Sequence, residues 1–452
     1  MRITCTRDAV VQYKTDHFEL FLQFVFVVFV CLGFTSCKGE SPSVAIHFSP
    51  DGSTIAYTYA DRIDLPLPPE VPTIYSTVYL QWCPAEQLKS YRSMKIDSYG
   101  KSYGSFVQNQ FGLLFSPDSR HIAVKSPRYL EVVDLESQTR HRLTNPDELV
   151  TSMGWLGNKE MVYVIHKKTG AGKHGADSTR QIFRHTIGES PEKRLLLYEQ
   201  FDYRGNYHDH VSPTGEYVVF MSQGYSDGIF YLLNVQTGKV VTFSEKKAQC
   251  QAVSWKPDGA SVFCLSSKEA MLLYPKEGRI KDLSDNYDND FRRHLAFAPE
   301  IDPQWTPDGR FIVINSTGMG GSLVCPDPWR VVPTGKLLVE YLEEKENQRV
   351  YHDPPDSYPI LYVQPYPGWV RIWLCLVTDN KPTMRGETVV LERRNYLVDY
   401  EGQKFIPMKT SFSPGGAWTL TPDGKKMVYF DRSIFLEEEP VHFPGNNQQS
   451  VP

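Results

Sequence analysis

Two short stretches of this sequence carry residue types that could do chemistry. The first, Gly224–Gly228, reads Gly-Tyr-Ser-Asp-Gly and matches the Gly-x-Ser-x-Gly pattern of serine nucleophiles. A serine in that pattern works only on a tight turn between a strand and a helix, with acid and histidine partners from the same sheet. No alternation of strand and helix patterns follows this stretch, so we interpret Ser226 as a turn residue.

The second stretch, His208–His210, reads His-Asp-His. Alternate residues of a strand share one face, so both imidazoles could face the same way and bind one metal ion. Two ligands are too few for a metal site, and the sequence offers no partner for them. Gly170–Lys173 lacks the full spacing of a phosphate-binding loop and predicts a hairpin tip. The sequence therefore predicts no catalytic residue, no metal and no cofactor, and it favours a protein that is not an enzyme.

The overall charge of the chain bears on its partners. The 452 residues include 48 basic and 53 acidic side chains, which gives a net charge of −5. A nucleic-acid-binding surface needs an excess of Lys and Arg, so we expect no nucleic-acid partner. The 26 Tyr, 24 Phe and 8 Trp residues favour strands over helices. The elements that position any functional side chain are therefore expected to be β-strands.

A five-residue phrase recurs along the chain and sets its organisation. It consists of an apolar residue, Ser or Thr, Pro, Asp and Gly, which is type I turn chemistry because Pro presets φ and Gly accepts a positive φ. Copies, some of them degenerate, occupy residues 48–52, 115–119, 155–159, 211–215, 255–259, 305–309, 412–416 and 420–424. Short apolar runs flank the copies, so each unit is predicted to be a β-hairpin.

The spacing of these copies predicts the fold class. A period of about 40–50 residues is typical of the four-stranded blades of a β-propeller. The clearest blade has predicted strands at 111–115, 121–125, 129–135 and 139–143. A blade without the phrase is predicted over 360–408, and the Pro-rich stretch 353–367 is predicted to be a loop. We predict an all-β fold, a single β-propeller of four-stranded blades, with eight blades favoured and seven as the alternative. No helical periodicity is found beyond the N-terminal segment.

The phrase, followed by a strand that ends near Asp-Leu, resembles the WD-like β-propeller repeat. That repeat occurs in TolB-type periplasmic proteins and in the propeller domain of prolyl oligopeptidase-like peptidases. The resemblance covers residues 44–438. It implies a radial platform around a central channel, used to hold partners or to gate an attached enzyme, and it does not fix the function. In such a platform His208 and His210 would line the channel.

The N-terminal residues have a different composition. Residues 20–34 are apolar apart from Gln23, a length that suits the core of a signal peptide better than a membrane span. The small residues before Cys37 resemble the cleavage box of bacterial lipoproteins, which implies lipidation of that cysteine. We predict a signal peptide over 1–37, a tether over 38–43, the propeller over 44–438 and a polar tail over 439–452. The alternative is an uncleaved anchor in which Cys37 is an ordinary residue.

These expectations lead to two classes of function. The first is an exported, lipid-anchored scaffold, attached to the membrane in the periplasm or at the cell surface, that binds an envelope protein, a peptide or a glycan. The second is an enzyme, either a lyase or hydrolase with a channel site around His208 and His210, or the propeller part of a prolyl oligopeptidase-like peptidase. The repeats extend over residues 44–438, and the sequence predicts no set of catalytic residues among them. These two features favour the scaffold. The sequence leaves the oligomeric state open.

Overall fold

The computed structural model describes most of the chain between residues 46 and 438. The described residues are 46–64, 74–88, 90–101, 112–126, 129–146, 148–172, 175–202, 209–221, 230–242, 252–265, 270–283, 303–314, 322–350, 363–383, 386–407, 418–420, 427–431 and 434–438. The chain divides into two compact units. The smaller unit includes Ala60–Tyr79 and Lys95–Phe106, which carry parts of strands β2, β3 and β4, and the larger unit contains the other described residues.

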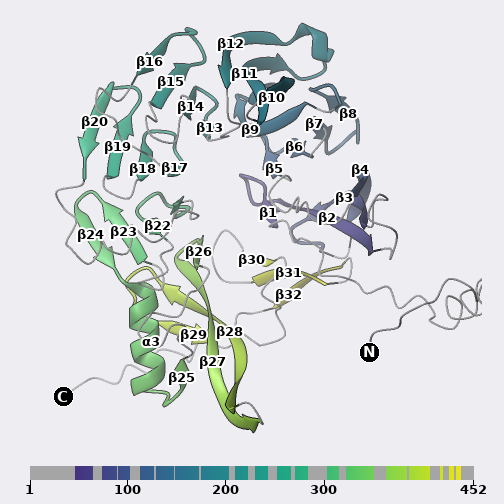
Figure 1. Ribbon diagram of the computed structural model, residues 1–452. Coiled ribbons are helices and arrows are strands. Elements are labelled where there is room, and N and C mark those ends of the chain that lie inside the picture. The colour runs from purple at the N-terminus through teal and green to yellow at the C-terminus, as the bar shows by residue number, and fades with distance from the viewer. Residues whose placement is uncertain are drawn as a thin grey trace, which may run out of the picture. The chain divides into compact units, whose positions relative to one another are not determined.

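The fold is an all-β propeller of seven blades built on four-stranded antiparallel sheets (Figure 1). The first blade contains β1 (His47–Phe48), β2 (Thr54–Asp64), β3 (Ile74–Pro84) and β4 (Arg92–Lys101). The second contains β5 (Gly112–Phe115), β6 (His121–Lys125), β7 (Leu130–Asp134) and β8 (Arg140–Arg142). The third contains β9 (Leu149–Leu156), β10 (Glu160–Gly172), β11 (Gly175–Thr186) and β12 (Leu195–Asp202), with the 3-10 helix η1 (Pro191–Lys193) before β12. The strands predicted over 111–143 are thus confirmed in the second blade.

The next three blades repeat the same order of strands. The fourth contains β13 (Asp209–Val211), β14 (Tyr217–Met221), β15 (Phe230–Asn234) and β16 (Val240–Thr242). The fifth contains β17 (Ala252–Trp255), β18 (Val262–Leu265), β19 (Ala270–Tyr274) and β20 (Arg279–Asp282). The sixth contains β21 (Gln304–Trp305), β22 (Ile312–Ile314), β23 (Ser322–Pro326) and β24 (Trp329–Val332). In each, consecutive strands pair, so every blade is a meander.

The seventh blade departs from the repeat. Its sheet runs β25 (Arg349–Val350), β27 (Trp369–Thr383), β28 (Gly386–Asp399) and β29 (Phe405–Pro407), and β26 (Val363–Tyr366) also pairs with β27. A last sheet of three strands within the described residues follows, made of β30 (Trp418–Leu420), β31 (Met427–Asp431) and β32 (Ile434–Glu438). The four-stranded propeller is therefore confirmed with seven complete blades, which was the alternative count. The eighth predicted unit is this three-stranded sheet.

The recurring phrase forms the tight turn between the first two strands of a blade. Ser116 Oγ donates to Asp118 Oδ1 at 2.6 Å, and it accepts from the backbone N–H of His121 at 2.9 Å. The same closure recurs at Ser49 and Thr306, the second residues of two other copies. The fifth position has a positive φ, +62° at Ser119, which explains why Gly occupies it in most copies. The turn chemistry predicted from the sequence is confirmed.

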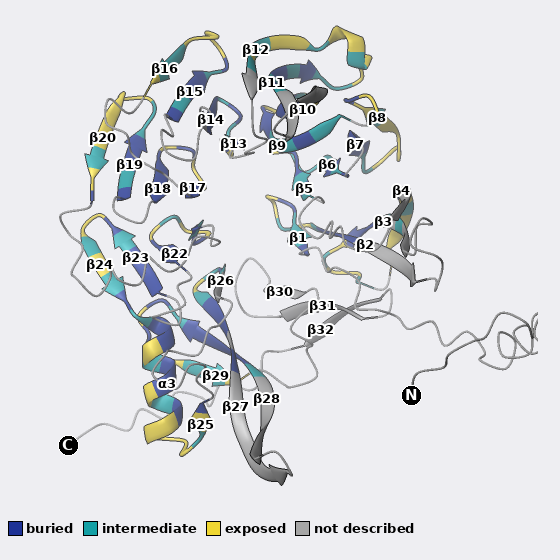
Figure 2. Cartoon of the chain, in the orientation of Figure 1, coloured by how far each residue is buried: buried dark blue, intermediate teal, exposed yellow. Residues whose placement is uncertain are grey.

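Apolar clusters between neighbouring sheets form the core. One cluster joins the third and fourth blades and includes Val162, Ile182 and Phe220, and another joins the fifth and sixth blades around Phe263 and Trp305. Figure 2 shows that buried residues, in dark blue, occur along the inner strands of the blades. Three indole N–H groups also connect the first strand of one blade to the first strand of the blade before it. Trp155 Nε1 donates to Leu114 O at 3.2 Å, Trp255 Nε1 to His210 O at 3.0 Å and Trp305 Nε1 to Ser254 O at 3.1 Å.

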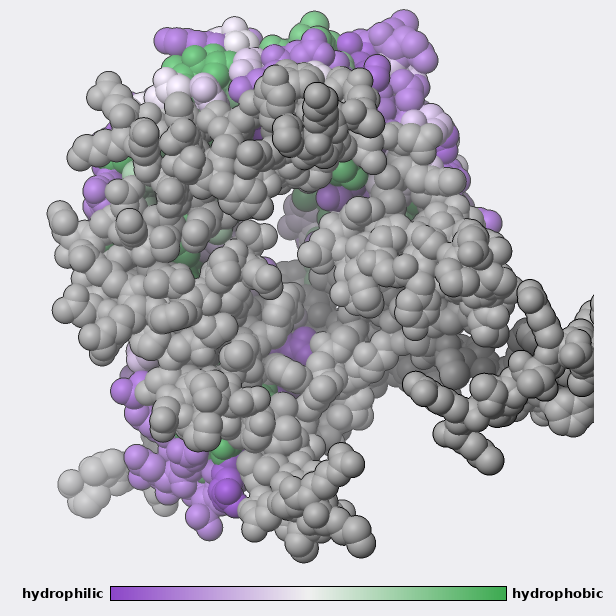
Figure 3. Space-filling view, viewed as in Figure 1, coloured by the Kyte–Doolittle hydropathy of each residue, from purple (hydrophilic) through white to green (hydrophobic). Residues whose placement is uncertain are grey.

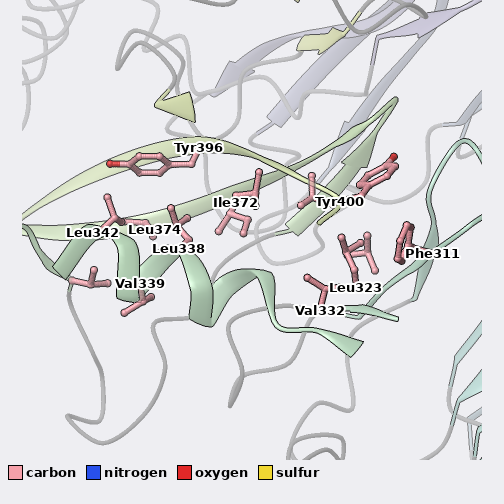
Figure 4. Packing of buried hydrophobic residues seen from close by; sticks show 14 residues of the cluster. Phe311, Leu323, Val332, Leu338, Val339, Leu342, Ile372, Leu374, Tyr396 and Tyr400 are labelled. Carbon is pink, nitrogen blue, oxygen red and sulfur yellow. The ribbon is translucent and has the colours of Figure 1, made fainter. Parts of the chain in front are cut away.

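Two sequence predictions about this region of the chain were wrong. The chain does contain a helix, α3 (Thr334–Glu344), which buries Leu338, Val339 and Leu342 against the strands of the sixth and seventh blades (Figure 4). Its apolar residues cover only one short face, so its periodicity was missed in a window of 11 residues. Part of the predicted Pro-rich loop is strand β26, in which Pro365 lies opposite Val370.

Within the described residues, no helix has the length and apolar character needed to cross a membrane.

Candidate functional site: a buried charge cluster

The predicted site residues fall partly outside the described residues. Cys37, His208 and Ser226 are among those that the structure leaves undescribed. His210 lies on β13, half-buried, and its main-chain oxygen accepts the indole N–H of Trp255. Within the described part of the chain, no group of three or more His, Cys, Asp and Glu side chains is placed to hold a metal ion.

Asp209, which lies between the two predicted histidines in the sequence, is the centre of a buried group of charged side chains. Its Oδ2 lies 2.7 Å from His166 Nε2 and accepts the hydroxyl of Thr151 at 2.8 Å. Its Oδ1 accepts from Arg180 Nε at 2.7 Å. The side chains of His166, Arg180 and Asp209 are at most 1% exposed. We call Thr151, His166, Arg180 and Asp209 the Asp209 cluster.

Strand register explains how the sequence assembles this cluster. His166 on β10 lies directly opposite Arg180 on β11, and Arg180 lies opposite Gln200 on β12. Side chains of directly opposed residues share one face of the sheet, so they form a polar row across the third blade. Arg180 Nη1 extends this row by donating to Gln200 Oε1 at 3.4 Å. Asp209 enters from β13 of the fourth blade and meets the row, so the cluster joins two blades.

The electrostatics of the cluster favour an ionised Asp209. Burial by itself raises the pKa of a carboxyl group, because the charged form loses its hydration. Here the hydrogen bond with His166 and the positive charge of Arg180 outweigh burial, and the pKa of Asp209 lies below its ordinary value. Asp209 therefore pairs as an anion with the buried Arg180 guanidinium and offsets part of the cost of its burial.

The composition of the cluster resembles acid–base machinery, but its surroundings do not allow that use. A His–Asp pair can position an imidazole to move protons, provided that a substrate reaches the imidazole. His166 and Asp209 are closed off from solvent, so a substrate has no access to them. The arrangement can hold two blades together in one register, which is the best-supported use of buried charge.

A second polar group lies in the same blade, next to the second blade. Arg194 forms two hydrogen bonds with Glu148, at 2.6 and 2.7 Å, and its guanidinium lies 4.2 Å above the ring centre of Phe183. Tyr163 Oη donates to Leu143 O of the second blade at 3.0 Å and lies 3.3 Å from His185 Nδ1.

Burial is the largest influence on the pKa of two side chains in this second group. Burial raises the pKa of Tyr163 far above its ordinary value and lowers the pKa of His185, so both side chains stay neutral at pH 7. A neutral phenol can donate a hydrogen bond to the carbonyl of Leu143, as observed. This group therefore also connects blades, on the opposite side of the third blade from Asp209.

The sequence pattern predicted His208 and His210 as site residues and did not predict Asp209. On a strand, neighbouring residues point to opposite faces, so the rule that predicted a histidine pair also separates Asp209 from His210. One signal was available: an Asp that begins a first strand just before the apolar Val211 must be solvated or paired. Its partners could not be identified, because His166 and Arg180 are distant in sequence from it.

Comparisons with known proteins found no matching family model and several distant structural matches. No family model matches the chain, and no curated protein matches it in sequence. Among solved structures, an oligogalacturonate lyase in complex with manganese matches with a TM-score of 0.42 and 11% identity, over 88% of this chain and 89% of that one. Kuenenia stuttgartiensis hydrazine synthase matches with a TM-score of 0.39 and 13% identity, over 91% and 99%. Pyrococcus horikoshii acylaminoacyl peptidase matches with 0.43 and 12% identity, over 88% and 57%. At these values the matches carry no argument about the activity of this chain.

Proposed function

We propose that this chain is an exported β-propeller that acts as a binding scaffold in the cell envelope. The observation that carries the proposal is the use of its charged residues. The residues best suited to acid–base chemistry, His166, Arg180 and Asp209, are buried between two blades and fix one blade against the next. Polar residues that fix neighbouring blades against each other give a rigid platform. A rigid platform suits the presentation of loops to a partner.

The attachment to the membrane is the second part of the proposal. The apolar run over 20–34 and the small residues before Cys37 support a lipoprotein-like signal, in keeping with the resemblance to WD-like, TolB-type repeats. Several acyl chains on Cys37 would hold the propeller at the membrane, whereas a single chain binds only marginally. The proposed location is therefore the periplasm or the cell surface.

Intact mass spectrometry of the native protein tests the anchor. We expect a species that begins at Cys37 and carries lipid. Cys37→Ser should remove the lipid and release the chain from the membrane fraction, and Cys325→Ser is the matched control because its side chain lies within the propeller. A native chain that begins at Met1 with a free thiol at position 37 contradicts this part of the proposal.

Crosslinking in intact cells, followed by purification, tests the scaffold. We expect an envelope protein, a peptide or a glycan to be recovered with the wild-type chain. The contrary outcome is recovery of no partner, together with labelling of the wild-type chain but not of Ser226→Ala by a serine-directed probe. That outcome would favour an enzyme with a nucleophile at Ser226.

A further inference from the structure

One buried histidine of the third blade, His185 on β11, is only 1% exposed. Its Nδ1 lies 3.3 Å from Tyr163 Oη, and this hydroxyl donates a hydrogen bond to Leu143 O. Because the hydroxyl proton is used there, the ring proton of neutral His185 belongs on Nδ1, where it can bond to the hydroxyl oxygen. Within the described residues, no hydrogen-bond partner lies in contact with Nε2. A second proton, on Nε2, would therefore be buried without a partner.

The charges around His185 balance one another at pH 7. Glu148 and Arg194 form an ion pair at 2.6 Å, and their side chains are 12% and 14% exposed. Tyr163 is neutral, because burial raises its pKa. Burial is also the largest influence on the pKa of His185, and the positive Arg194 lowers it further, whereas nearby main-chain oxygens and the Glu189 carboxylate act in the opposite direction. A proton on His185 would therefore place a second positive charge beside Arg194, whose own charge is already matched by Glu148.

A short surface segment connects His185 to Arg194. We call residues 187–194 the clamp loop. It contains η1, in which no residue is buried, and its first residue packs on the apolar cluster between the second and third blades. At its other end, Arg194 is held by two hydrogen bonds with Glu148 and by the ring of Phe183. Figure 3 shows hydrophilic side chains, in purple, at the top of the view, where the third blade lies. The clamp loop can therefore open towards water without separating strands.

We propose that His185 and the clamp loop form an acid-sensitive latch at the junction of the second and third blades. Protonation of His185 opens the clamp loop, so that water solvates the charged ring and Arg194 leaves Glu148. Deprotonation closes the loop again. In this latch His185 is the sensor, and the Glu148–Arg194 pair is the contact that holds the loop closed. This inference does not depend on the proposed membrane attachment or on a partner.

The pH range of the latch follows from the pKa of His185. In the closed state this pKa lies below its ordinary value of 6.5, and opening restores the ordinary value. The closed state is therefore fully favoured above pH 6.5, and its advantage is lost as pH falls below that value towards the folded pKa. In this range the equilibrium constant for opening should rise by up to about tenfold per pH unit.

Hydrogen exchange of the full chain, followed by mass spectrometry from pH 7.5 to pH 5, tests the latch. Main-chain hydrogen bonds hold the amides of Ile187 and Lys193, so opening of the clamp loop exposes them. After correction for the intrinsic pH dependence of exchange, peptides over 187–194 should lose protection by up to about tenfold per pH unit below pH 6.5. Peptides over 262–274, in the fifth blade, should not change. Constant protection of the clamp loop across this range overturns the inference.

A substitution at position 185 isolates the sensor. His185→Asn removes the titrating ring and keeps an amide donor near the position of Nδ1, so protection of the clamp loop should no longer depend on pH. His121→Asn is the matched control, because His121 lies beside the carboxylates of Asp118 and Asp134 and should leave the wild-type pH dependence intact. Circular dichroism checks that both variants fold. Persistence of the pH dependence in His185→Asn, or its loss in His121→Asn, overturns the inference.

A substitution in the ion pair separates the holding contact from the sensor, and it tests the latch even if His185→Asn does not fold. Glu148→Gln removes the carboxylate charge that holds Arg194. The clamp loop should then exchange at least about fivefold faster at pH 7.5, because a hydrogen-bonded charge is lost. The dependence on pH below 6.5 should remain, because His185 is still present. Unchanged exchange at pH 7.5, or loss of the pH dependence, overturns the assigned roles.

Discussion

Two junctions between neighbouring blades use the same repeat but differ in how they are held. The junction between β9 and β13 contains the Asp209 cluster, and there the hydroxyl of Ser152 accepts the backbone N–H of Val211 at 2.9 Å. The junction between β17 and β21 is held by an apolar cluster and by the indole N–H of Trp305, which donates to Ser254 O. The first junction is polar and buried, and the second is mainly apolar.

The two junctions also differ in how closely the backbones approach. A Cβ added to Gly215 would lie 2.4 Å from the main-chain oxygen of Trp155, and one added to Gly154 would lie 2.9 Å from that of Ser212. At the other junction, a Cβ on Gly309 would meet side chains and no backbone atom among its nearest neighbours, with Lys256 at 2.9 Å and Pro257 at 3.7 Å. Buried polar pairs and backbone contacts tolerate little displacement, whereas apolar side chains can repack. The repeat therefore sets the fold, and the residues that one blade places against the next set how rigid each junction is.

The largest difference between the junctions should come from removing the buried charge. Asp209→Asn keeps the size of the side chain but removes the carboxylate charge that pairs with the buried Arg180 guanidinium. We expect the free energy of unfolding at pH 7 to fall by about 3–5 kcal/mol, measured by urea denaturation. Asp258→Asn is the control, because its half-exposed carboxylate pairs with Lys256 and should contribute about 1 kcal/mol or less. Similar losses in both variants would remove the distinction between the junctions.

The backbone contact can be tested with a pair of glycines that share the same turn position. Gly215 and Gly309 both have a φ of +68°. Gly215→Ala adds a clash with backbone to the cost of a side chain at positive φ, so we expect a loss of about 3 kcal/mol. Gly309→Ala incurs the φ cost with a side chain that can move aside, so we expect about 1–2 kcal/mol. Thermal and urea denaturation should rank the variants in this order, and the reverse order would contradict the comparison.

Acid should lower the contribution of Asp209 to the stability of the polar junction, and comparison with a variant at this position measures that contribution. The pKa of Asp209 in the folded chain lies below its ordinary value of 3.8, so its contribution to stability is present above that value and is lost as pH falls through the folded pKa. The difference in unfolding free energy between wild type and Asp209→Asn should shrink by up to about 1.4 kcal/mol per pH unit below pH 4. Urea denaturation from pH 5 to pH 2 measures this, and a constant difference would show that Asp209 is not the titrating group.

The smallest effect is expected at the apolar junction. Trp305→Phe removes the indole N–H that bonds to Ser254 O but keeps an aromatic ring in the cluster. We expect a loss of about 1 kcal/mol, the net contribution of one hydrogen bond, together with a small packing term. Trp255→Phe, which breaks the equivalent bond to His210 O, should behave alike. A loss as large as that of Asp209→Asn would mean that both junctions depend on polar contacts.

The sequence by itself determined the β-propeller, its four-stranded blades and the turn that opens most of them. Turn chemistry is local, because Ser116 contacts Asp118 and His121, which both lie within five positions of it. The blade without the phrase was also predicted from a local pattern, because residues 396–404 repeat the apolar strand and polar turn seen in other blades. The structure places this pattern at the end of β28. Helix α3 was missed because it is short and lies among strands.

Only the tertiary structure decided what the candidate residues do. His166, Arg180 and Asp209 come from three strands, and their contact depends on the register of one blade and on the approach of the next. Likewise, Leu195 and Leu196 look like core residues in the sequence, and only the place of β12 at the end of its sheet makes them surface. The physical reason is that a turn needs nearby residues alone, whereas burial and ion pairing depend on which distant strands become neighbours.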